Sequence, residues 1–190
     1  MQFQESDLQF RFDDQAWVLR KYDAHRFYRA ISGSGLKGVD FIGIWKKDRL
    51  VLIEVKNYVN RHPRQTDDPA ALDTVLLAQK VAQKARDTLK AIDIIHRYYR
   101  RLWWIRLWGG WLQRRSPRRY DWAFWSRVFT LAAEAHQVWI VLWLEAEGMP
   151  LELRQVLHEQ LHAALDGTVA GVMVADRSQH PFGDTLHVNL

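Results

Sequence analysis

Residues 39–58 read VDFIGIWKKDRLVLIEVKNY, and this stretch decides the fold. Two runs of β-branched, aromatic and aliphatic residues, 39–45 and 50–58, flank a short polar turn, which predicts two antiparallel strands joined as a hairpin. The second run is apolar on both alternating faces as far as Glu54, as expected of a central strand that is covered on both sides. Glu54 and Lys56 therefore enter an apolar environment, where charges that lack a partner cost several kcal/mol.

Three charged side chains are expected to converge at the end of this hairpin. Glu54 and Lys56 are two positions apart on one strand, so they point to the same face. Asp40 lies near the start of the other strand and projects toward the same point if the short turn sets the register. Two neighbouring carboxylates suit Mg²⁺, or Mn²⁺ as a substitute, and a nearby lysine can hold or deprotonate a water molecule that attacks a phosphate. The pattern predicts hydrolysis of a phosphodiester bond.

The motif also resembles a known family, the PD-(D/E)xK nucleases of the restriction endonuclease-like superfamily. The residues that carry the resemblance are two tripeptides, Gly38-Val39-Asp40 and Glu54-Val55-Lys56. It covers residues 31–83 and extends to 138–144, which would be the fourth strand of the family's core. The Ser-Gly-rich turn at 32–35 is similar to that of archaeal Holliday junction resolvases. Val39 stands at the position of the proline that names the motif.

The resemblance implies a fold, a cofactor and roles for four residues. The fold would be an α/β restriction endonuclease-like core with a mixed central sheet flanked by helices. Asp40 and Glu54 would bind Mg²⁺, and the carbonyl of Val55 would be a third ligand. Lys56 would position the attacking water molecule.

Many members of the family use a further acidic residue on their first helix. Five residues of this chain compete for that role, namely Glu5, Asp7, Asp13, Asp14 and Asp23. Asp13 and Asp14 rank slightly ahead because they would cap a helix predicted over 13–23.

The patterns on either side of the hairpin predict a layered α/β fold. Apolar residues at helical spacing, opened by Asp68-Pro69, predict a long helix that continues to about His96. Before the hairpin, a helix over 13–23 and a strand over 25–32 are one interpretation, and an extended segment over 17–22 is the alternative. After the long helix, the patterns predict two helices with breaks at 109–110 and 116–117 and an end near 134, a strand over 138–144, a helix over 150–165, and strands over 169–174 and 185–188.

Length and composition limit the possibilities further. At roughly 150 residues per domain, 190 residues predict a single nuclease-like domain over 1–190, with a helical insertion over 97–136. The chain has no cysteine, so a metal would need oxygen or imidazole ligands. Because no signal or transit pattern is visible, we expect a cytoplasmic protein.

The basic charge is concentrated in one segment. The chain has a net charge of +5, but residues 97–127 contain nine Arg and one Asp and carry +8, which leaves −3 for the remainder. The segment also contains six of the ten Trp. Arg interleaved with Trp is typical of surfaces that contact phosphates, bases or lipid headgroups. Three interpretations follow: a nucleic-acid-binding insertion, a membrane-surface helix pair, or a face that packs against a second copy. We rank nucleic acid and a homodimer together above a membrane surface.

The predicted function is a metal-dependent nuclease that cleaves DNA, with RNA not excluded. The alternative is a catalytically inactive protein of the same fold that binds nucleic acid or a protein partner through the Arg/Trp segment. The candidate nucleic-acid contacts are Ser34, Lys37, Gln79, Gln83, Arg114, Arg115, Arg118 and Arg119.

Overall fold

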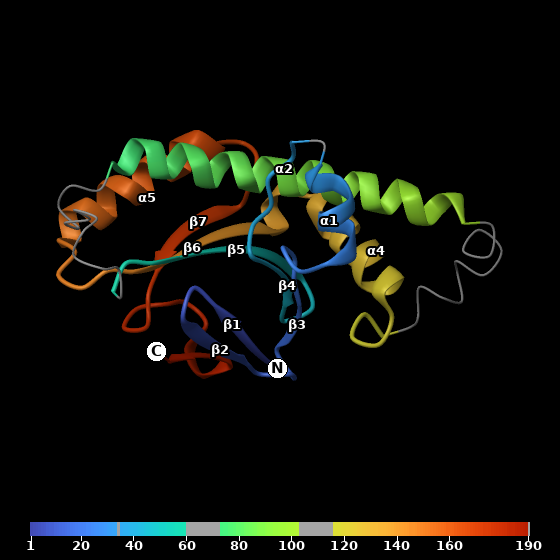
Figure 1. Cartoon of the computed structure of the whole chain (residues 1–190), viewed down its shortest axis with the longest axis horizontal. Coiled ribbons are helices and arrows are strands. Elements are labelled where there is room, and N and C mark those ends of the chain that lie inside the picture. The colour runs from blue at the N-terminus through green and yellow to red at the C-terminus, as the bar shows by residue number, and fades with distance from the viewer. Residues whose placement is uncertain (34, 60–72, 103–115, 190) are drawn as a thin grey trace.

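A five-stranded mixed sheet forms the centre of the molecule (Figure 1). The computed structural model describes residues 1–33, 35–59, 73–102 and 116–189. The first three strands form an antiparallel meander, and the last two run parallel to the third, in the order β3-β4-β5-β6-β7. The strands are β3 (Trp17–Lys21), β4 (Phe41–Trp45), β5 (Arg49–Asn57), β6 (Val138–Glu145) and β7 (Gly171–Ala175). The predicted hairpin and the predicted mixed sheet are therefore confirmed.

Helices cover one face of this sheet (Figure 1). The long helix α2 crosses the face and packs against α5 and α4, with the short α1 beside it. Ile42 and Leu52 point to this side, and their side chains pack among apolar residues of the helices. The helices are α1 (Arg26–Ser32), α2 (Thr74–Arg101), α4 (Asp121–Ala132) and α5 (Leu151–Leu165).

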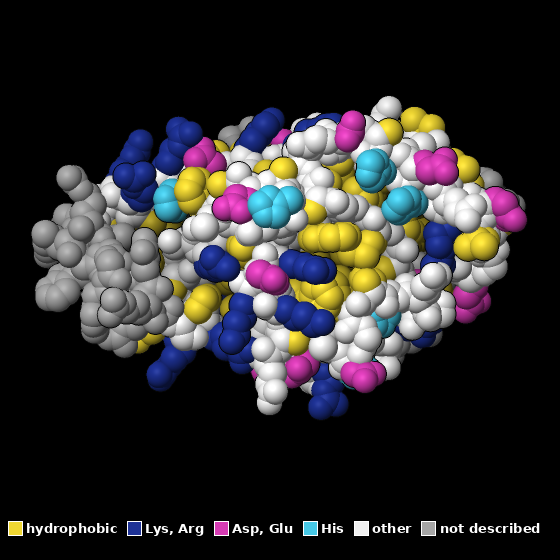
Figure 2. Space-filling model, turned by 180° about the vertical axis from the view of Figure 1, so that it is seen from behind, with side chains coloured by type: hydrophobic (Ala, Val, Ile, Leu, Met, Phe, Trp, Pro, Cys, Tyr) yellow, Lys and Arg dark blue, Asp and Glu magenta, His cyan; other side chains and the backbone are white. Residues whose placement is uncertain are grey.

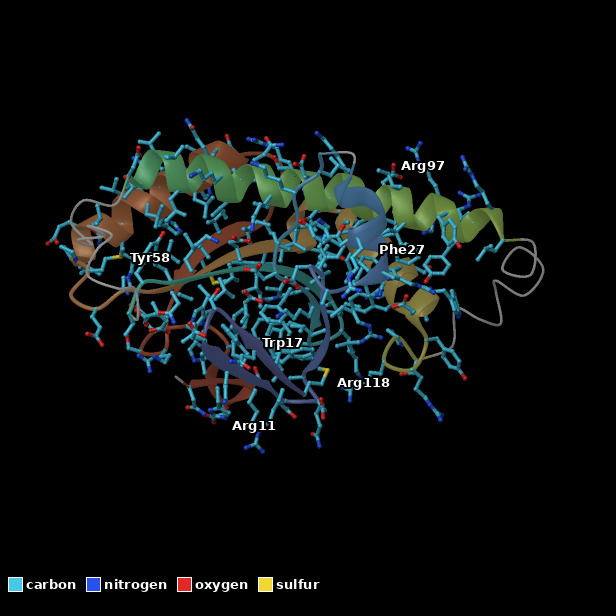
Figure 3. All side chains as sticks on the ribbon, viewed as in Figure 1. Arg11, Trp17, Phe27, Tyr58, Arg97 and Arg118 are labelled. Atoms are coloured by element: carbon cyan, nitrogen blue, oxygen red, sulfur yellow. The ribbon has the colours of Figure 1, made fainter. Side chains whose placement is uncertain are left out.

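A small antiparallel sheet covers the opposite face. Its strands are β1 (Gln2–Glu5), β2 (Leu8–Phe12) and β8 (Leu186–Asn189), in the order β1-β2-β8. Residues facing this side of the central sheet, such as Phe41 and Val51, form a second core with Phe10 and Trp17. Figure 3 shows Trp17 between the two sheets, whereas Arg11 points away from them. The central sheet is thus buried on both faces, which explains the apolar run of β5.

For the amino-terminal part, one of the two interpretations of residues 17–22 is correct, and the strand predicted over 25–32 is wrong. Residues 17–21 are a strand, so the extended alternative to a helix over 13–23 is correct. Residues 26–32 are a helix where a strand over 25–32 was predicted. The helical geometry near Asp13 is a single turn, in which the Trp17 amide donates to the Asp13 carbonyl at 3.0 Å. Trp17 and Leu19 then alternate into the second core, and this packing favours the strand.

The elements after the hairpin follow the prediction closely. The long helix begins at Thr74, where the Asp73 side chain accepts a hydrogen bond from the Leu76 amide at 2.8 Å, and it continues past His96 to Arg101. The predicted cap Asp68 lies outside the described residues. The strand β6, the helix α5 and the strands β7 and β8 lie where the patterns placed them.

The Arg/Trp segment is described only in part. The helix α4 begins after the predicted break at 116–117 and ends near the predicted position, while the first predicted helix lies mostly in 103–115, outside the described residues. Trp122 and Trp125 are buried in the core beneath the helices, so these two Trp side chains contribute to packing. Among the described helices, none combines the length and the apolar character of a membrane-spanning segment.

Candidate active site

The structure brings Asp40 and Glu54 to adjacent positions on neighbouring strands. Because Phe41 pairs with Ile53, Asp40 lies beside the part of β5 that carries Glu54. The Asp40 amide donates to the Ile53 carbonyl at 3.1 Å, and Asp40 Oδ2 accepts from the Val55 amide at 2.7 Å. The Asp40 residue is only 9% exposed. The hairpin register therefore places both predicted carboxylates at one site.

Glu54 is held by two lysines. Its side chain is fully buried, and Lys56 Nζ lies 2.5 Å from Oε1, as expected for side chains on one face of a strand. Lys84 of α2 donates to Oε1 at 2.7 Å and to Oε2 at 2.9 Å. We call these three residues the Glu54 ion-pair group. The two ammonium groups compensate a carboxylate that would otherwise be buried without a partner.

Sequence reasoning missed Lys84, although a signal was present. Lys84 follows Val81 by three residues and precedes Thr88 by four, so it lies on the buried face of α2. A lysine on such a face needs a partner, and here the partner is the carboxylate of the central strand. The two predicted glutamines of α2 are less directly involved. Gln79 is exposed, and Gln83 Nε2 donates to Asp87 Oδ1 at 2.9 Å.

A second group of carboxylates adjoins Asp40. One carboxylate oxygen from each of Glu5, Asp23 and Asp40 lies within 4.8 Å of the others. We call these residues the acidic cluster. Asp23 Oδ1 is buried and has no hydrogen-bond partner among the described residues, whereas Glu5 forms an ion pair with Lys21 at 2.8 Å. Glu5 comes from β1 and Asp23 follows β3, so the small sheet and the central sheet both contribute.

The helix cap that ranked Asp13 and Asp14 ahead as the additional acidic residues does not form. Asp14 pairs with the Met1 amino group at 2.9 Å, and Asp13 Oδ1 accepts from the Gln15 amide at 3.0 Å. Neither residue caps a helix, because residues 17–21 form a strand. No local pattern identifies Glu5 or Asp23, since tertiary pairing brings them to Asp40.

Burial and neighbouring charge set the protonation of this site. Burial, together with the negative charge of Glu54, raises the pKa of Asp40 to about 7. Burial also raises the pKa of Asp23, and the charge of Glu5 adds to this shift. Burial alone would lower the pKa of Lys84, but the charge and hydrogen bonds of Glu54 raise it above its ordinary value. Lys84 is therefore a permanent cation near neutral pH, while Asp40 titrates there.

The segment before Asp40 is anchored to α2. The Lys37 amide donates to Asp87 Oδ2 at 3.2 Å, and the Val39 amide donates to Thr88 Oγ1 at 3.1 Å. At Gly38, a Cβ atom would lie 2.7 Å from ring carbons of Tyr22 and Tyr28. The glycine of the motif is thus required by the close approach of two aromatic rings.

The predicted nucleic-acid contacts that the structure describes do not form one group. Ser34, Arg114 and Arg115 lie outside the described residues, and Lys37 is exposed next to the site. Arg118 and Arg119 are exposed on the segment before α4. Figure 3 shows Arg118 far from Tyr58, which directly follows β5. Elsewhere on the surface, Figure 2 shows hydrophobic side chains adjacent to Lys and Arg side chains.

Comparison with protein-family models, with curated proteins and with solved structures gives no match for this chain.

Proposed function

We propose that the protein is a metal-dependent nuclease that hydrolyses phosphodiester bonds in DNA. The observation that supports the proposal most strongly is that Asp40 and the Glu54 ion-pair group lie together at the end of β5, with both carboxylates buried. A meander followed by a helix and a parallel strand also agrees with the core that the motif implies. Charges concentrated at one end of an apolar strand are typical of a functional site.

The carboxylates suit a divalent cation of the Mg²⁺ class. Asp23 Oδ1 is buried without a partner among the described residues, and Asp40 is a buried carboxyl group whose pKa is raised to about 7. A bound cation would offset both unfavourable features, because Mg²⁺ prefers carboxylate oxygens. Asp40 would be the central ligand, with Glu54 and the Val55 carbonyl or the acidic cluster completing the set. When bound, the cation would polarise the scissile phosphate and neutralise developing charge.

The lysines have different roles in this proposal. Lys56 Nζ lies 3.3 Å from the Val55 carbonyl and 2.5 Å from Glu54 Oε1, which places its ammonium group where it can orient a water molecule beside the carboxylates. Lys84, whose pKa is raised, stays protonated and cannot act as a general base near neutral pH. It holds Glu54 in place and supplies positive charge for a bound phosphate.

A second candidate function has an observation in its favour. Lys84 occupies both oxygens of Glu54, so these oxygens are already neutralised. In an inactive protein of the same fold that binds nucleic acid or a protein partner, Lys84 would stay bound to both oxygens of Glu54. The two candidates differ in whether a metal produces cleavage.

The test is cleavage of plasmid, linear duplex and single-stranded DNA, and of RNA, in Mg²⁺ and in Mn²⁺. We expect cleavage that requires a metal and is lost in Asp40→Ala and Lys56→Ala. Lys80→Ala is the matched control, because Lys80 is exposed on α2 one turn before Lys84. If the folded wild-type protein cleaves no substrate with either metal but still shifts DNA in a gel, the nuclease proposal fails and the binding function replaces it.

Two further expectations belong to this proposal. We expect a homodimer, because a duplex has two strands to cut. The cytoplasm is the expected location.

A further inference from the structure

A pocket lies between α4 and the edge of the central sheet, at the turn end of the β4–β5 hairpin. Its volume is about 540 Å³, within the range of small-molecule sites. The half-buried Ala16, Val18 and Pro117 contribute apolar surface, whereas Ile44 and Trp122 line the pocket with side chains that are almost wholly buried. Lys47 lines it from the β4–β5 turn, whereas Asp40 and Glu54 lie at the other end of these two strands. We call it the α4 pocket.

Among the described residues, the charged side chains that line the α4 pocket are all basic. Lys47, Arg118 and Arg127 line it, and no Asp or Glu does so among the described residues. The Met1 amino group lowers the pKa of Asp14, with a smaller contribution from Arg118, but Asp14 does not line the pocket. The hydroxyl group of Ser126 is a further polar group at the wall. The pocket therefore favours an anion that also carries an apolar part.

Hydrogen bonds hold both walls of the α4 pocket in place. Arg20 of β3 donates to the carbonyls of Pro117 at 3.2 Å and Arg118 at 3.3 Å, which fixes the segment that carries Arg118. Arg127 donates to the Lys47 carbonyl at 2.8 Å and links α4 to the turn. These bonds order both walls, so little further ordering is needed on binding.

The turn that carries Lys47 is conformationally strained. Lys46 and Lys47 have φ values of 48° and 73°, in the left-handed region that glycine and asparagine favour. Two consecutive lysines in this conformation are unusual for a hairpin turn, and strain of this kind concentrates at functional sites. This observation is independent of the shape of the pocket.

We propose that the α4 pocket binds a small organic phosphate with a flat apolar body, of which a nucleoside monophosphate is representative. The phosphate lies among Lys47, Arg118 and Arg127, where charge-assisted hydrogen bonds are strong. The base packs on the half-buried apolar side chains of Ala16, Val18 and Pro117. The pocket is larger than an inorganic phosphate requires, which favours the organic ligand. This inference does not depend on the proposed nuclease activity.

Isothermal titration calorimetry of the full chain tests the proposal, with AMP, adenosine and inorganic phosphate as probes. We expect AMP to bind, and adenosine and phosphate each to bind at least about ten-fold more weakly, since each lacks one part of the recognition. Arg118→Ala should weaken AMP binding about ten-fold or more. Ser126→Phe, which fills the pocket from a half-buried position, should abolish binding.

Arg49→Ala is the control, because Arg49 is exposed next to the same turn and does not line the pocket. Its dissociation constant for AMP should equal that of the wild type. Circular dichroism melting confirms that each variant is folded. The proposal is overturned if AMP does not bind at millimolar concentration, if adenosine binds as tightly as AMP, or if folded Arg118→Ala and Ser126→Phe bind AMP like the wild type.

Discussion

The carboxyl group of Asp40 should make the stability of the protein depend on pH. Its pKa is raised from 3.8 to about 7 by burial and by Glu54. Between these values the folded protein holds a proton that the unfolded chain has released. The contribution of this carboxyl group to the free energy of unfolding is therefore fully present below about pH 4 and is lost as the pH rises to about 7.

Asp40→Asn should remove this dependence, because an amide keeps an oxygen that accepts from Val55 but carries no charge. In metal-free buffer, we expect its stability advantage over the wild type to grow by about 2–3 kcal/mol between pH 5 and pH 8. Urea unfolding at both pH values measures this difference. Asp48→Asn, at an exposed turn position, is the control. An equal advantage at both pH values would contradict the shifted pKa.

Lys84 should contribute to the stability of the fold, independently of any role in catalysis. Removing it leaves the fully buried Glu54 with Lys56 as the remaining partner of the ion-pair group, so Lys84→Ala should lower the free energy of unfolding by about 1–3 kcal/mol. Lys80→Ala should change it by less than about 0.5 kcal/mol, as is usual for an exposed position. Urea unfolding at pH 7 compares the two variants. Equal effects would show that the Lys84–Glu54 contact contributes nothing to stability.

At the residue scale, the sequence reveals those site residues that a single hairpin brings together. Glu54 and Lys56 share a strand face, and Asp40 follows from the register of the adjoining strand. Lys84 is 30 residues from its partner Glu54, and only its place on the buried helix face hints at a role. Glu5 reaches the site because β1 pairs within a separate sheet, which no local spacing encodes.

The segment between α1 and β4 positions the site through its contacts with α2. Gly38 lies where a Cβ atom would come within 2.7 Å of the rings of Tyr22 and Tyr28. Gly38→Ala should therefore displace the segment and cost about 1–3 kcal/mol, as overpacking usually does. Gly33→Ala is the matched control from the same segment, because nothing lies within 4 Å of its added Cβ atom. Thermal melting should show a lowered midpoint for Gly38→Ala only. Equal midpoints would mean that the rings of Tyr22 and Tyr28 move aside at no cost in stability.

At the element scale, long periodic segments were predictable and short ones were not. The pattern of α2 extends over 28 residues, and β6 is an uninterrupted apolar run, so both were identified. The strand β3 has only five residues and α1 only seven; the sequence left helix and strand open for β3 and predicted a strand in place of α1. In such short segments tertiary packing decides the structure, here the burial of Trp17 and Leu19 between the two sheets.

At the scale of the whole molecule, the small sheet closes the second core by joining distant parts of the chain. Strand β2 pairs with β1 and also with β8, so that Gln9 lies opposite Asn189. The apolar side chains of β2, such as Phe10, then pack against the central sheet. The sequence predicted a strand at 185–188 but not its partner, because pairing over this separation leaves no periodic signal. The pairing of β2 with β1 and β8 also brings Glu5 close to Asp40.

A cation bound at the acidic cluster should link the two sheets. Glu5 belongs to the small sheet, whereas Asp23 and Asp40 flank strands of the central sheet. A ligand that binds only the folded state stabilises every element that supplies a contact. We therefore expect Mg²⁺ to slow amide hydrogen exchange in residues 2–12 of the wild type, measured by mass spectrometry at pH 8. The effect should disappear in Asp40→Asn and persist in Asp14→Asn, whose carboxylate pairs with the Met1 amino group instead. Slowed exchange in both variants would place the cation elsewhere, and unchanged exchange in the wild type would remove the acidic cluster from the metal site while leaving Glu54 and the Val55 carbonyl as ligands to be tested.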